Sequence, residues 1–385
     1  MSEKNFGRRE AIKRLGAVAS VSVGVLLGIT HNDIETADAG GTDSNSGVTS
    51  TNAPGTSTGA TDPGVSDIAP NGTGMSNKST ISEEQLNVVD VRDFGAKVDG
   101  TTDDTEALQK ALNSINPGGT VVLPPGEIRL SAMNKGTGSH QLPSAAIPIE
   151  RPDDGLTIRG VGPGPLGTRL VMEGGHKMNH TGISIDWDTS GNPDNEYNSL
   201  TVRDLEFDGN WWGQDPGQGQ YPNGFGVNIR GKTRDVVFEN CLFKNWASVG
   251  GLMQAPGIRT RNCTFMHNGY GLLQDGNHGH GFNVNTDGRK GRVVAKNCLF
   301  VDNSGEGIDA RKGKVTVKNS VFKNNGWGVK IKHKTEDVLL KRCRMENSGH
   351  MHIHCVPTGD EGTGRLALQT VLMDGSTWPA IPAVD

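Results

Sequence analysis

The sequence predicts an all-β chain folded as a parallel β-solenoid, a stack of short coils that share one core. The first observation is a repeated phrase, Asn297–Phe300 and Asn319–Phe322, whose phenylalanines are 22 residues apart. Related copies place a Phe or Met anchor at 207, 243, 265, 300, 322 and 345, with spacings of 36, 22, 35, 22 and 23. One coil of this length cannot bury its inner face alone, so successive coils must stack.

The second observation is the alternation of apolar and polar residues in Val315–Lys318 and Val329–Lys332. This pattern is typical of a strand with one buried face. Stacking places equivalent residues of neighbouring coils about 4.8 Å apart. The phenylalanines should then form one column, and a second column should hold small buried residues: Cys241, Cys263, Cys298, Ser320 and Cys343. We expect these cysteines to be buried thiols.

Composition limits the class of protein. The chain has 385 residues, of which 33% are hydrophobic and 55 are glycine, which suits a large, turn-rich domain. Its net charge of −5 is too mild to indicate a nucleic-acid partner. Five cysteines, an odd number, argue against a disulfide framework. No transmembrane segment of adequate length follows the N-terminal region.

Residues 1–39 are predicted to be an export signal. Arg8 and Arg9 precede an apolar run, Leu15–Ile29, and Ala37–Ala39 offers a cleavage site. This arrangement resembles a twin-arginine translocation signal, which implies a secreted or cell-surface protein exported in the folded state.

Residues 40–87 are rich in Gly, Ser and Thr. Such a segment has too little apolar surface to offset its ordering entropy, so we expect a disordered linker. The folded domain is expected over residues 88–385.

The start of this domain carries three recognisable segments, Val91–Asp104, Leu108–Leu112 and Gly118–Gly126. They resemble the opening of the pectate-lyase-like superfamily, which includes polygalacturonase-like hydrolases, alginate epimerases, lyases and phage tailspikes. The resemblance implies a single-stranded right-handed parallel β-helix, and because these families differ in chemistry it does not define a reaction.

An amphipathic helix is expected at residues 104–115, where it would close the N-terminal end of the solenoid. Asp103 is predicted to cap it, with Glu106 completing a capping box.

Candidate site residues lie on the strands that follow Gly-rich steps. Aligning these strands predicts two outward-facing columns, Asn228/Asn283/Asp309/Lys330/His352 and Arg230/Asn285/Arg311/Lys332/His354. Cations and amides in register can hold carboxylates, so the predicted partner is an acidic polysaccharide.

The leading interpretation is a lyase that cleaves a uronate-containing polysaccharide by β-elimination. This reaction requires a neutralised carboxylate and removal of the C5 proton. Lys330 or Lys332 is the predicted base, because clustered cations lower the pKa of a lysine. Arg311 is the predicted carboxylate clamp and His352 an alternative base or acid. Asp309 has two open roles, holding a cation such as Ca²⁺ or orienting a lysine.

The remaining candidates for binding are aromatic. Trp211 and Trp212 lie in a Gly- and Gln-rich loop and are predicted to form a platform that stacks on sugar rings. A second interpretation of this loop is that its aromatic residues only attach it to the core.

Two other functions stay open. A polygalacturonase-type hydrolase needs two nearby carboxyl groups, with Asp287, Glu306 and Asp309 as candidates. Segments 285–288 and 279–281 resemble two polygalacturonase motifs, but in reversed order and without the paired aspartates between them. The Asp-Pro-His-Glu motif of alginate epimerases is absent. The third candidate is a non-catalytic glycan-binding surface protein.

A metal site is a further weak candidate. His350, His352 and His354 share one strand face, but no carboxylate flanks them in register.

Overall fold

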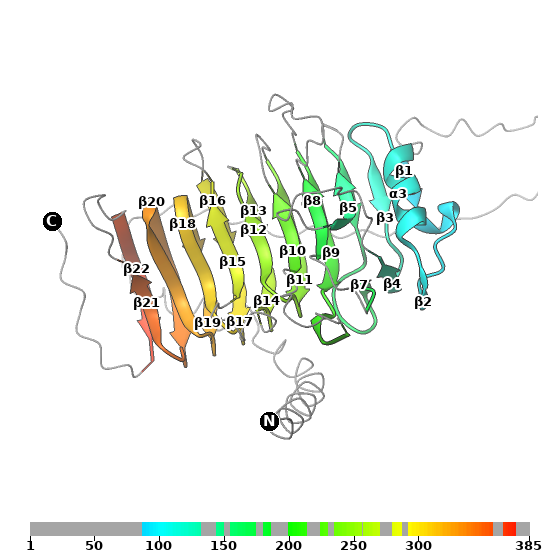
Figure 1. Cartoon of the computed structure of the whole chain (residues 1–385). Coiled ribbons are helices and arrows are strands. Elements are labelled where there is room, and N and C mark those ends of the chain that lie inside the picture. The colour runs from blue at the N-terminus through cyan, green and yellow to red at the C-terminus, as the bar shows by residue number, and fades with distance from the viewer. Residues whose placement is uncertain are drawn as a thin grey trace, which may run out of the picture. The chain divides into compact units, whose positions relative to one another are not determined.

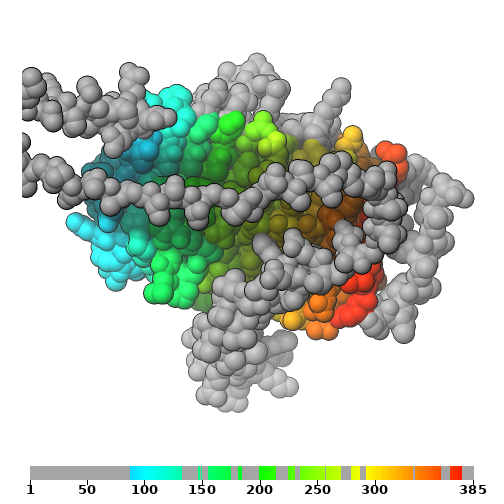
Figure 2. All heavy atoms as spheres, turned by 180° about the vertical axis from the view of Figure 1, so that it is seen from behind, coloured from blue at the N-terminus to red at the C-terminus, as the bar shows by residue number. Residues whose placement is uncertain are grey.

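The computed structural model describes residues 87–131, 144–149, 155–174, 180–185, 199–213, 224–229, 235–255, 257–269, 279–286, 292–356 and 365–374. The predicted export signal, and all but the last residue of the predicted linker, lie outside this part of the chain. The described strands pair in parallel and follow one another coil by coil from β1 to β22 (Figure 1). The same order of coils is visible from the opposite side in Figure 2. The prediction of an all-β, right-handed parallel β-helix is confirmed.

The strands form three stacks that share the interior. Five strands bend through more than one stack: β9 (Thr201–Asp208), β11 (Val237–Lys244), β18 (Glu306–Lys318), β20 (Trp327–Glu346) and β22 (Arg365–Met373). The first stack also contains β1 (Val88–Asp90), β3 (Thr120–Val122), β6 (Thr157–Arg159), β13 (Arg259–Arg261) and β16 (Arg292–Lys296). The second adds β2 (Asp99–Asp103), β4 (Gly126–Leu130), β7 (Thr168–Met172), β14 (Thr264–Met266), β17 (Leu299–Val301) and β19 (Val321–Lys323). The third adds β5 (Ser144–Ile149), β8 (His180–Ile185), β10 (Gly224–Ile229), β12 (Val249–Met253), β15 (His280–Asn285) and β21 (Met351–Cys355).

The predicted columns form the core. The rings of Phe207, Phe243, Phe265, Phe300 and Phe322 stack with centroid distances of 5.0, 5.0, 5.3 and 4.8 Å. Met345 continues this column and is fully buried. The four cysteines of the second column are buried and free, and burial raises the pKa of Cys298 to about 12. The prediction of buried thiols is therefore confirmed.

Turns between stacks rely on asparagine. Asn262, Asn297 and Asn319 occupy one turn position in successive coils, with φ of 52°, 55° and 49°. Asparagine tolerates this left-handed region better than most residues. Their side chains also bond one another, with Nδ2–Oδ1 distances of 3.2 Å for Asn297–Asn262 and 3.2 Å for Asn319–Asn297. This ladder holds neighbouring coils in register.

Arg342 takes the same turn position in the next coil, with φ of 51°. Arg342 Nε already donates to Asn319 Oδ1 at 2.8 Å, so the ladder reaches this coil. Arg342→Asn is expected to raise the free energy of unfolding by roughly 0.5–1 kcal/mol, because asparagine tolerates this backbone conformation better. Urea unfolding measures the change. Arg344→Asn, on the strand that follows, is the matched control and should not stabilise. Equal effects at both positions would contradict the explanation from backbone conformation.

The N-terminal helix α3 (Thr105–Ser114) packs against the 3-10 turn η2 (Val91–Phe94) and adds Leu108 and Ala111 to the core. The predicted capping box is wrong. Asp104 is the cap residue, but its carboxylate accepts hydrogen bonds from the backbone N–H groups of Lys97 and Val98 at 2.7 and 2.9 Å. Glu106 instead pairs with Lys110, one turn along the helix.

Two further features complete the fold. The last strand, β22, covers Arg365–Met373 and ends the described part of the β-helix. Among the described residues, no helix has both the length and the apolar character needed to cross a membrane.

Candidate active site

The third stack brings charged residues from β15, β18 and β20 together. Six of them form what we term the lysine cluster: His280, Glu306, Asp309, Arg311, Lys330 and Lys332. Neighbouring strands lie about 4.8 Å apart, so residues of three successive coils reach one another. Four of the five predicted catalytic residues therefore lie together: Asp309, Arg311, Lys330 and Lys332. His280 and Glu306, which were considered only for hydrolysis, lie with them.

The predicted register holds only in part. The pairing runs through Asn228, Leu252, Asn283, Asp309, Lys330 and His354. His354, and not His352, therefore lies next to Lys330. Leu252 belongs to β12, a coil that the alignment missed because its strand carries no polar residue at this position.

The second predicted column is also broken. A bulge shifts β18 after Ala310, so Asn285 pairs with Lys312 and Lys312 pairs with Lys334. Toward β15, Arg311 is therefore the extra residue and does not lie opposite Asn285. Toward β20 the extra residue is on β20, where positions 332 and 333 lie opposite Arg311. Bulges re-aim side chains next to functional sites. Here the bulge lets Arg311 Nε donate to Asp309 Oδ2, two residues earlier, at 2.5 Å.

Four members of the predicted outward-facing columns are buried and not solvated. Asn228, Asn283, Asp309 and His352 are 1%, 4%, 0% and 5% exposed. Asn228 lies three strands before Asp309 in the stack, and Asn285 is half-buried. Arg230 and Asp287 lie outside the described residues.

Glu306 is fully buried and links two cations. Its Oε1 accepts a hydrogen bond from Lys330 Nζ at 2.6 Å, and its Oε2 contacts His280 Nδ1. Burial alone would raise the pKa of Glu306, but its contacts with His280 and Lys330 outweigh burial and lower it to about 2. Glu306 is therefore ionised throughout the neutral range.

Asp309 is the second fully buried carboxylate. Besides Arg311, its Oδ2 receives Asn283 Nδ2 at 3.5 Å and faces His280 Nε2 at 3.4 Å. Its other oxygen, Oδ1, is buried and has no hydrogen-bond partner among the described residues. A buried carboxylate oxygen without a partner is costly, so this atom suits a donor brought by a ligand.

Lys332 differs from the other cations of the cluster. Its Nζ lies 3.9 Å from Asp309 Oδ2, outside hydrogen-bond distance, whereas Lys330 is bonded to Glu306. Burial lowers the pKa of Lys332, and the charges of Arg311 and Lys330 lower it further against the opposing pull of Asp309. A lysine that loses its proton more easily is the best base in the cluster.

The cations form the accessible layer of the lysine cluster. The side chains of Arg311, Lys332 and Lys330 are 42%, 29% and 21% exposed, whereas both carboxylates are fully buried beneath them. Trp327 lies under Lys330, with Nζ 5.2 Å from the ring centroid. His354 borders this layer, and burial together with the charge of Lys330 lowers its pKa. A ligand therefore meets a positive surface.

His352 is not part of the site, which corrects the prediction. It is 5% exposed, its Nδ1 lies 2.9 Å from Ser348 Oγ, and its Nε2 lies 3.1 Å from the Asp374 carbonyl oxygen. The preceding coils have buried asparagines at this turn, Asn268, Asn303 and Asn325, which bond to one another and to backbone carbonyls. In the last coil both ring nitrogens of His352 have partners, Ser348 and Asp374, so the role of His352 is structural.

The three-histidine metal site is not supported either. His352 has the partners just described, and His350 stacks on Trp327 at 4.2 Å. Among the described residues, the group with metal-ligand spacing is His280, Glu306 and Asp309, whose ligand atoms lie within 4.8 Å of one another. Ca²⁺ prefers about six to eight oxygen ligands, and here the carboxylates already bind Lys330 and Arg311. The donor set therefore does not fit calcium.

His280 and Glu306 entered the prediction only through the hydrolase alternative. Each lies between glycines, in Gly279–Gly281 and Gly305–Gly307. An added Cβ at Gly281 or Gly307 would come within 3.0 and 2.8 Å of the next strand's backbone, so only glycine fits there. A histidine or glutamate between two such glycines was the feature of the sequence that could have identified these two residues as part of the site.

Trp211 and Trp212 lie apart from the lysine cluster. They form η3 (Trp211–Gly213), which follows β9 and precedes β10. Two coils separate β10 from β15 along the third stack. The two tryptophans are therefore neighbours but do not lie beside the lysines, and their role as a sugar platform stays a prediction.

Known families match both ends of the β-helix. Residues 88–141 match the family "Rhamnogalacturonase A/epimerase, pectate lyase-like", and residues 274–362 match "Right handed beta helix region". The N-terminal fragment of bacteriophage phi29 gene product 12 shares the fold, with a TM-score of 0.54 and 16% identity over 74% of this chain and 47% of that one. The tailspike of E. coli bacteriophage HK620 gives 0.51 and 13%, over 76% and 52%. These matches support a right-handed β-helix of the pectate-lyase-like kind.

Two curated proteins with similar sequences act on uronate polymers according to their names. The chain is 30% identical to mannuronan C5-epimerase AlgE6 of Azotobacter vinelandii over 214 residues, which cover 51% of this chain and 23% of the relative. It is 35% identical to alginate lyase 7 of the same organism over 144 residues, 37% of this chain and 15% of the relative. The chain thus spans less than a quarter of either protein.

Proposed function

We propose that this protein is an enzyme that modifies a uronate-containing polysaccharide, and that it acts as a lyase by β-elimination. The observation that carries the proposal is the lysine cluster, with accessible cations above two buried, ionised or ion-paired carboxylates. With neutral histidine and protonated lysines the cluster bears one net positive charge. Such a surface attracts a polyanion and neutralises a uronate carboxylate.

The proposed reaction begins at C5 of the uronate. Arg311 holds the sugar carboxylate, which makes the C5 proton more acidic. Lys332 takes that proton, and the electron pair moves onto the neutralised carboxylate. The pair then forms the C4–C5 double bond while the C4–O bond breaks. The Lys330 ammonium, positioned by Glu306, supplies a proton to the departing oxygen. The base and the acid are thus two lysines held by different carboxylates.

C5 epimerisation is the second candidate, favoured by the names of the relatives. It shares the first step, and the two reactions diverge only afterwards. In epimerisation the C4–O bond stays intact, and a proton returns to C5 from the other face of the ring. The missing Asp-Pro-His-Glu motif argues for elimination. The relatives include proteins named as epimerases and one named as a lyase, and both names are compatible with a site that abstracts the C5 proton.

Hydrolysis is disfavoured by the charge state of Glu306. A glycosidase needs one carboxyl group that is protonated and donates to the leaving oxygen. Glu306 has a pKa of about 2, so it cannot serve as that acid near neutral pH. Asp309 is occupied by Arg311. Export to the cell surface, where such polymers occur, is part of the same proposal.

The test is an activity screen of the purified protein on alginate, mannuronan, pectate and neutral glycans. Ultraviolet absorbance of unsaturated uronide and new reducing ends are followed together. We expect both to rise on one uronate polymer. Reducing ends without absorbance would indicate a hydrolase. Binding without any product would leave a non-catalytic glycan-binding protein.

A further inference from the structure

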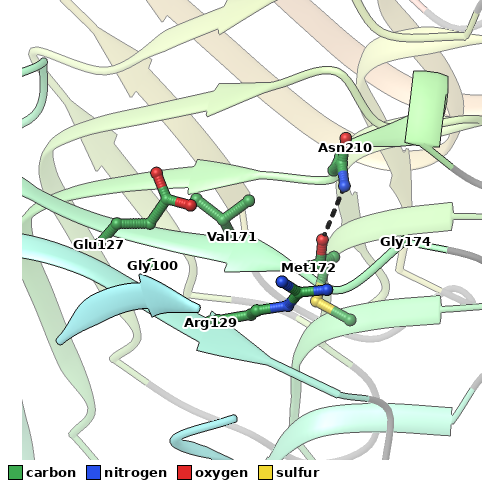
Figure 3. A pocket seen from close by; sticks show the side chains of 7 residues that line it. All are labelled: Gly100, Glu127, Arg129, Val171, Met172, Gly174 and Asn210. Atoms are coloured by element: carbon green, nitrogen blue, oxygen red, sulfur yellow. Dashed lines mark hydrogen bonds between the residues drawn. The ribbon is translucent and has the colours of Figure 1, made fainter. Parts of the chain in front are cut away.

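A cavity lies on a different stack from the lysine cluster. It has a volume of about 190 Å³ and is lined by residues of β4, β7 and the turn after β9 (Figure 3). Glu127, Arg129 and Asn210 supply its polar groups, and Val171 supplies apolar surface, whereas the Met172 side chain belongs to the core. The proposed reaction uses none of these residues.

The tryptophan pair adjoins this cavity. Asn210 lines it, and Trp211 and Trp212 follow directly in the chain. Gly174, another lining residue, packs so closely that an added Cβ would come 2.9 Å from the Gly213 carbonyl oxygen. The two indole rings lie 4.7 Å apart between centroids, and Trp212 is 42% exposed. The aromatic pair therefore lies next to the cavity.

The turn that carries the tryptophans is held firmly. The Trp211 backbone N–H donates to the Asn245 carbonyl at 3.1 Å, and Asn210 Nδ2 donates to the Met172 carbonyl at 3.1 Å (Figure 3). The Trp211 indole N–H is buried and has no hydrogen-bond partner among the described residues. A fixed aromatic surface loses little entropy on binding, and an unsatisfied donor favours a ligand oxygen.

The charged groups suit a glycan. Arg129 Nη2 lies 3.3 Å from Glu173, and Glu127 pairs with Arg169 at 2.7 Å. All four side chains remain about a third exposed, so they can also bind hydroxyl or carboxylate groups. Guanidinium groups bind carboxylates, and an indole face packs against the apolar face of a pyranose.

We propose that the cavity and the Trp211–Trp212 pair form a second glycan site, which binds a distant stretch of the same polysaccharide chain. The identity of the ligand rests on the proposed function. The tryptophans follow β9, and β9 precedes β14, which leads into β15, by two coils. At about 4.8 Å per coil, the nearest part of the second site is displaced roughly 10 Å along the axis from the lysine cluster, and it lies on another stack. It therefore binds polymer without taking part in the chemistry.

Trp212→Ala tests this assignment. The KM for the long polymer should rise about tenfold, equivalent to losing ~1.4 kcal/mol of binding. The kcat, and the KM for short oligosaccharides that cannot span both sites, should not change. Trp212→Phe should restore most of the affinity, because it keeps an aromatic face. Arg129→Gln should weaken polymer binding without changing kcat. Leu166→Ala removes another exposed apolar side chain, 94% exposed, and is the control.

Polymer affinity is also measured without turnover, by retardation of each variant in gels containing alginate. If the wild type turns over polymer and Trp212→Ala has the same KM, the second site is overturned and the proposed function stands. If no variant turns over polymer, but the gel retards the wild type and not Trp212→Ala, the second site is supported and the lyase function is overturned. No retardation and no turnover would overturn both.

Discussion

Lys332→Ala is expected to lower kcat on the uronate polymer by about 10²–10⁴-fold, the usual contribution of a general base. The variant should bind polymer almost as tightly as the wild type, because Arg311 and Lys330 still face the ligand. Lys332→Arg should not restore turnover, because a guanidinium keeps its proton. Initial rates and gel retardation measure the two effects.

Lys334→Ala is the matched control, because Lys334 is exposed on the same strand and pairs with Lys312 outside the cluster. It should keep near wild-type kcat. If Lys332→Ala retained half of the activity, another residue would have to be the base, and His280 and His354 would be the next candidates.

The pH profile provides a second check on Lys332. The base works only when deprotonated and the acid, Lys330, only when protonated, so kcat/KM should rise with pH through the pKa of Lys332 and fall again once Lys330 loses its proton. Burial and neighbouring cations lower the pKa of Lys332 below the ordinary lysine value of 10.5. The midpoint of the rise should therefore lie below pH 10.5. A profile without a rise between neutral and alkaline pH would contradict this role.

Glu306→Ala is expected to destabilise the protein by about 3–5 kcal/mol, the cost of removing one partner of a buried ion pair. Lys330 and His280 would both lose their contact with a carboxylate. Glu306→Gln keeps the shape of the side chain and should lower the free energy of unfolding by less. Urea unfolding of each variant at neutral pH measures the effect. Glu336→Gln is the control, because Glu336 forms a surface pair with Lys314 at 3.5 Å and should change stability very little.

The same residue predicts an acid dependence. The pKa of Glu306 is lowered from 4.5 to about 2, so its stabilising contribution is fully present above pH 4.5 and is lost as the pH falls toward 2. The stability difference between wild type and Glu306→Gln should therefore shrink between pH 5 and pH 3. A difference that stayed constant over this range would show that Glu306 does not titrate as described.

The fold could be predicted from the sequence because the repeated residues are side chains that face the core. The phenylalanine and cysteine columns have the spacing of one coil, and each was found in register. The missed coil at β12 has a Gly-Gly-Leu strand, in which neither the anchor nor the polar pattern is visible.

The site was harder to predict than the fold. The residue types of the site were predictable from the repeat, and Lys330, Lys332, Asp309 and Arg311 do lie together. The sequence did not show that Arg311 is a bulge residue, because an extra residue in a strand shifts register without changing the local pattern. It also did not show that His352 turns into the last coil, because that depends on the carbonyl of Asp374, 22 residues further on.

The central claim is that this site removes the proton at C5 of a uronate. The most direct measurement is NMR of mannuronan and pectate incubated with the protein in D₂O, with Lys332→Ala alongside. The account predicts unsaturated chain ends that lack the C5 proton, formed by the wild type and not by the variant. Deuterium at C5 of intact chains would still show that the C5 proton is removed, but the reaction would then be epimerisation and not elimination. Saturated new ends with every C5 proton retained would contradict the account.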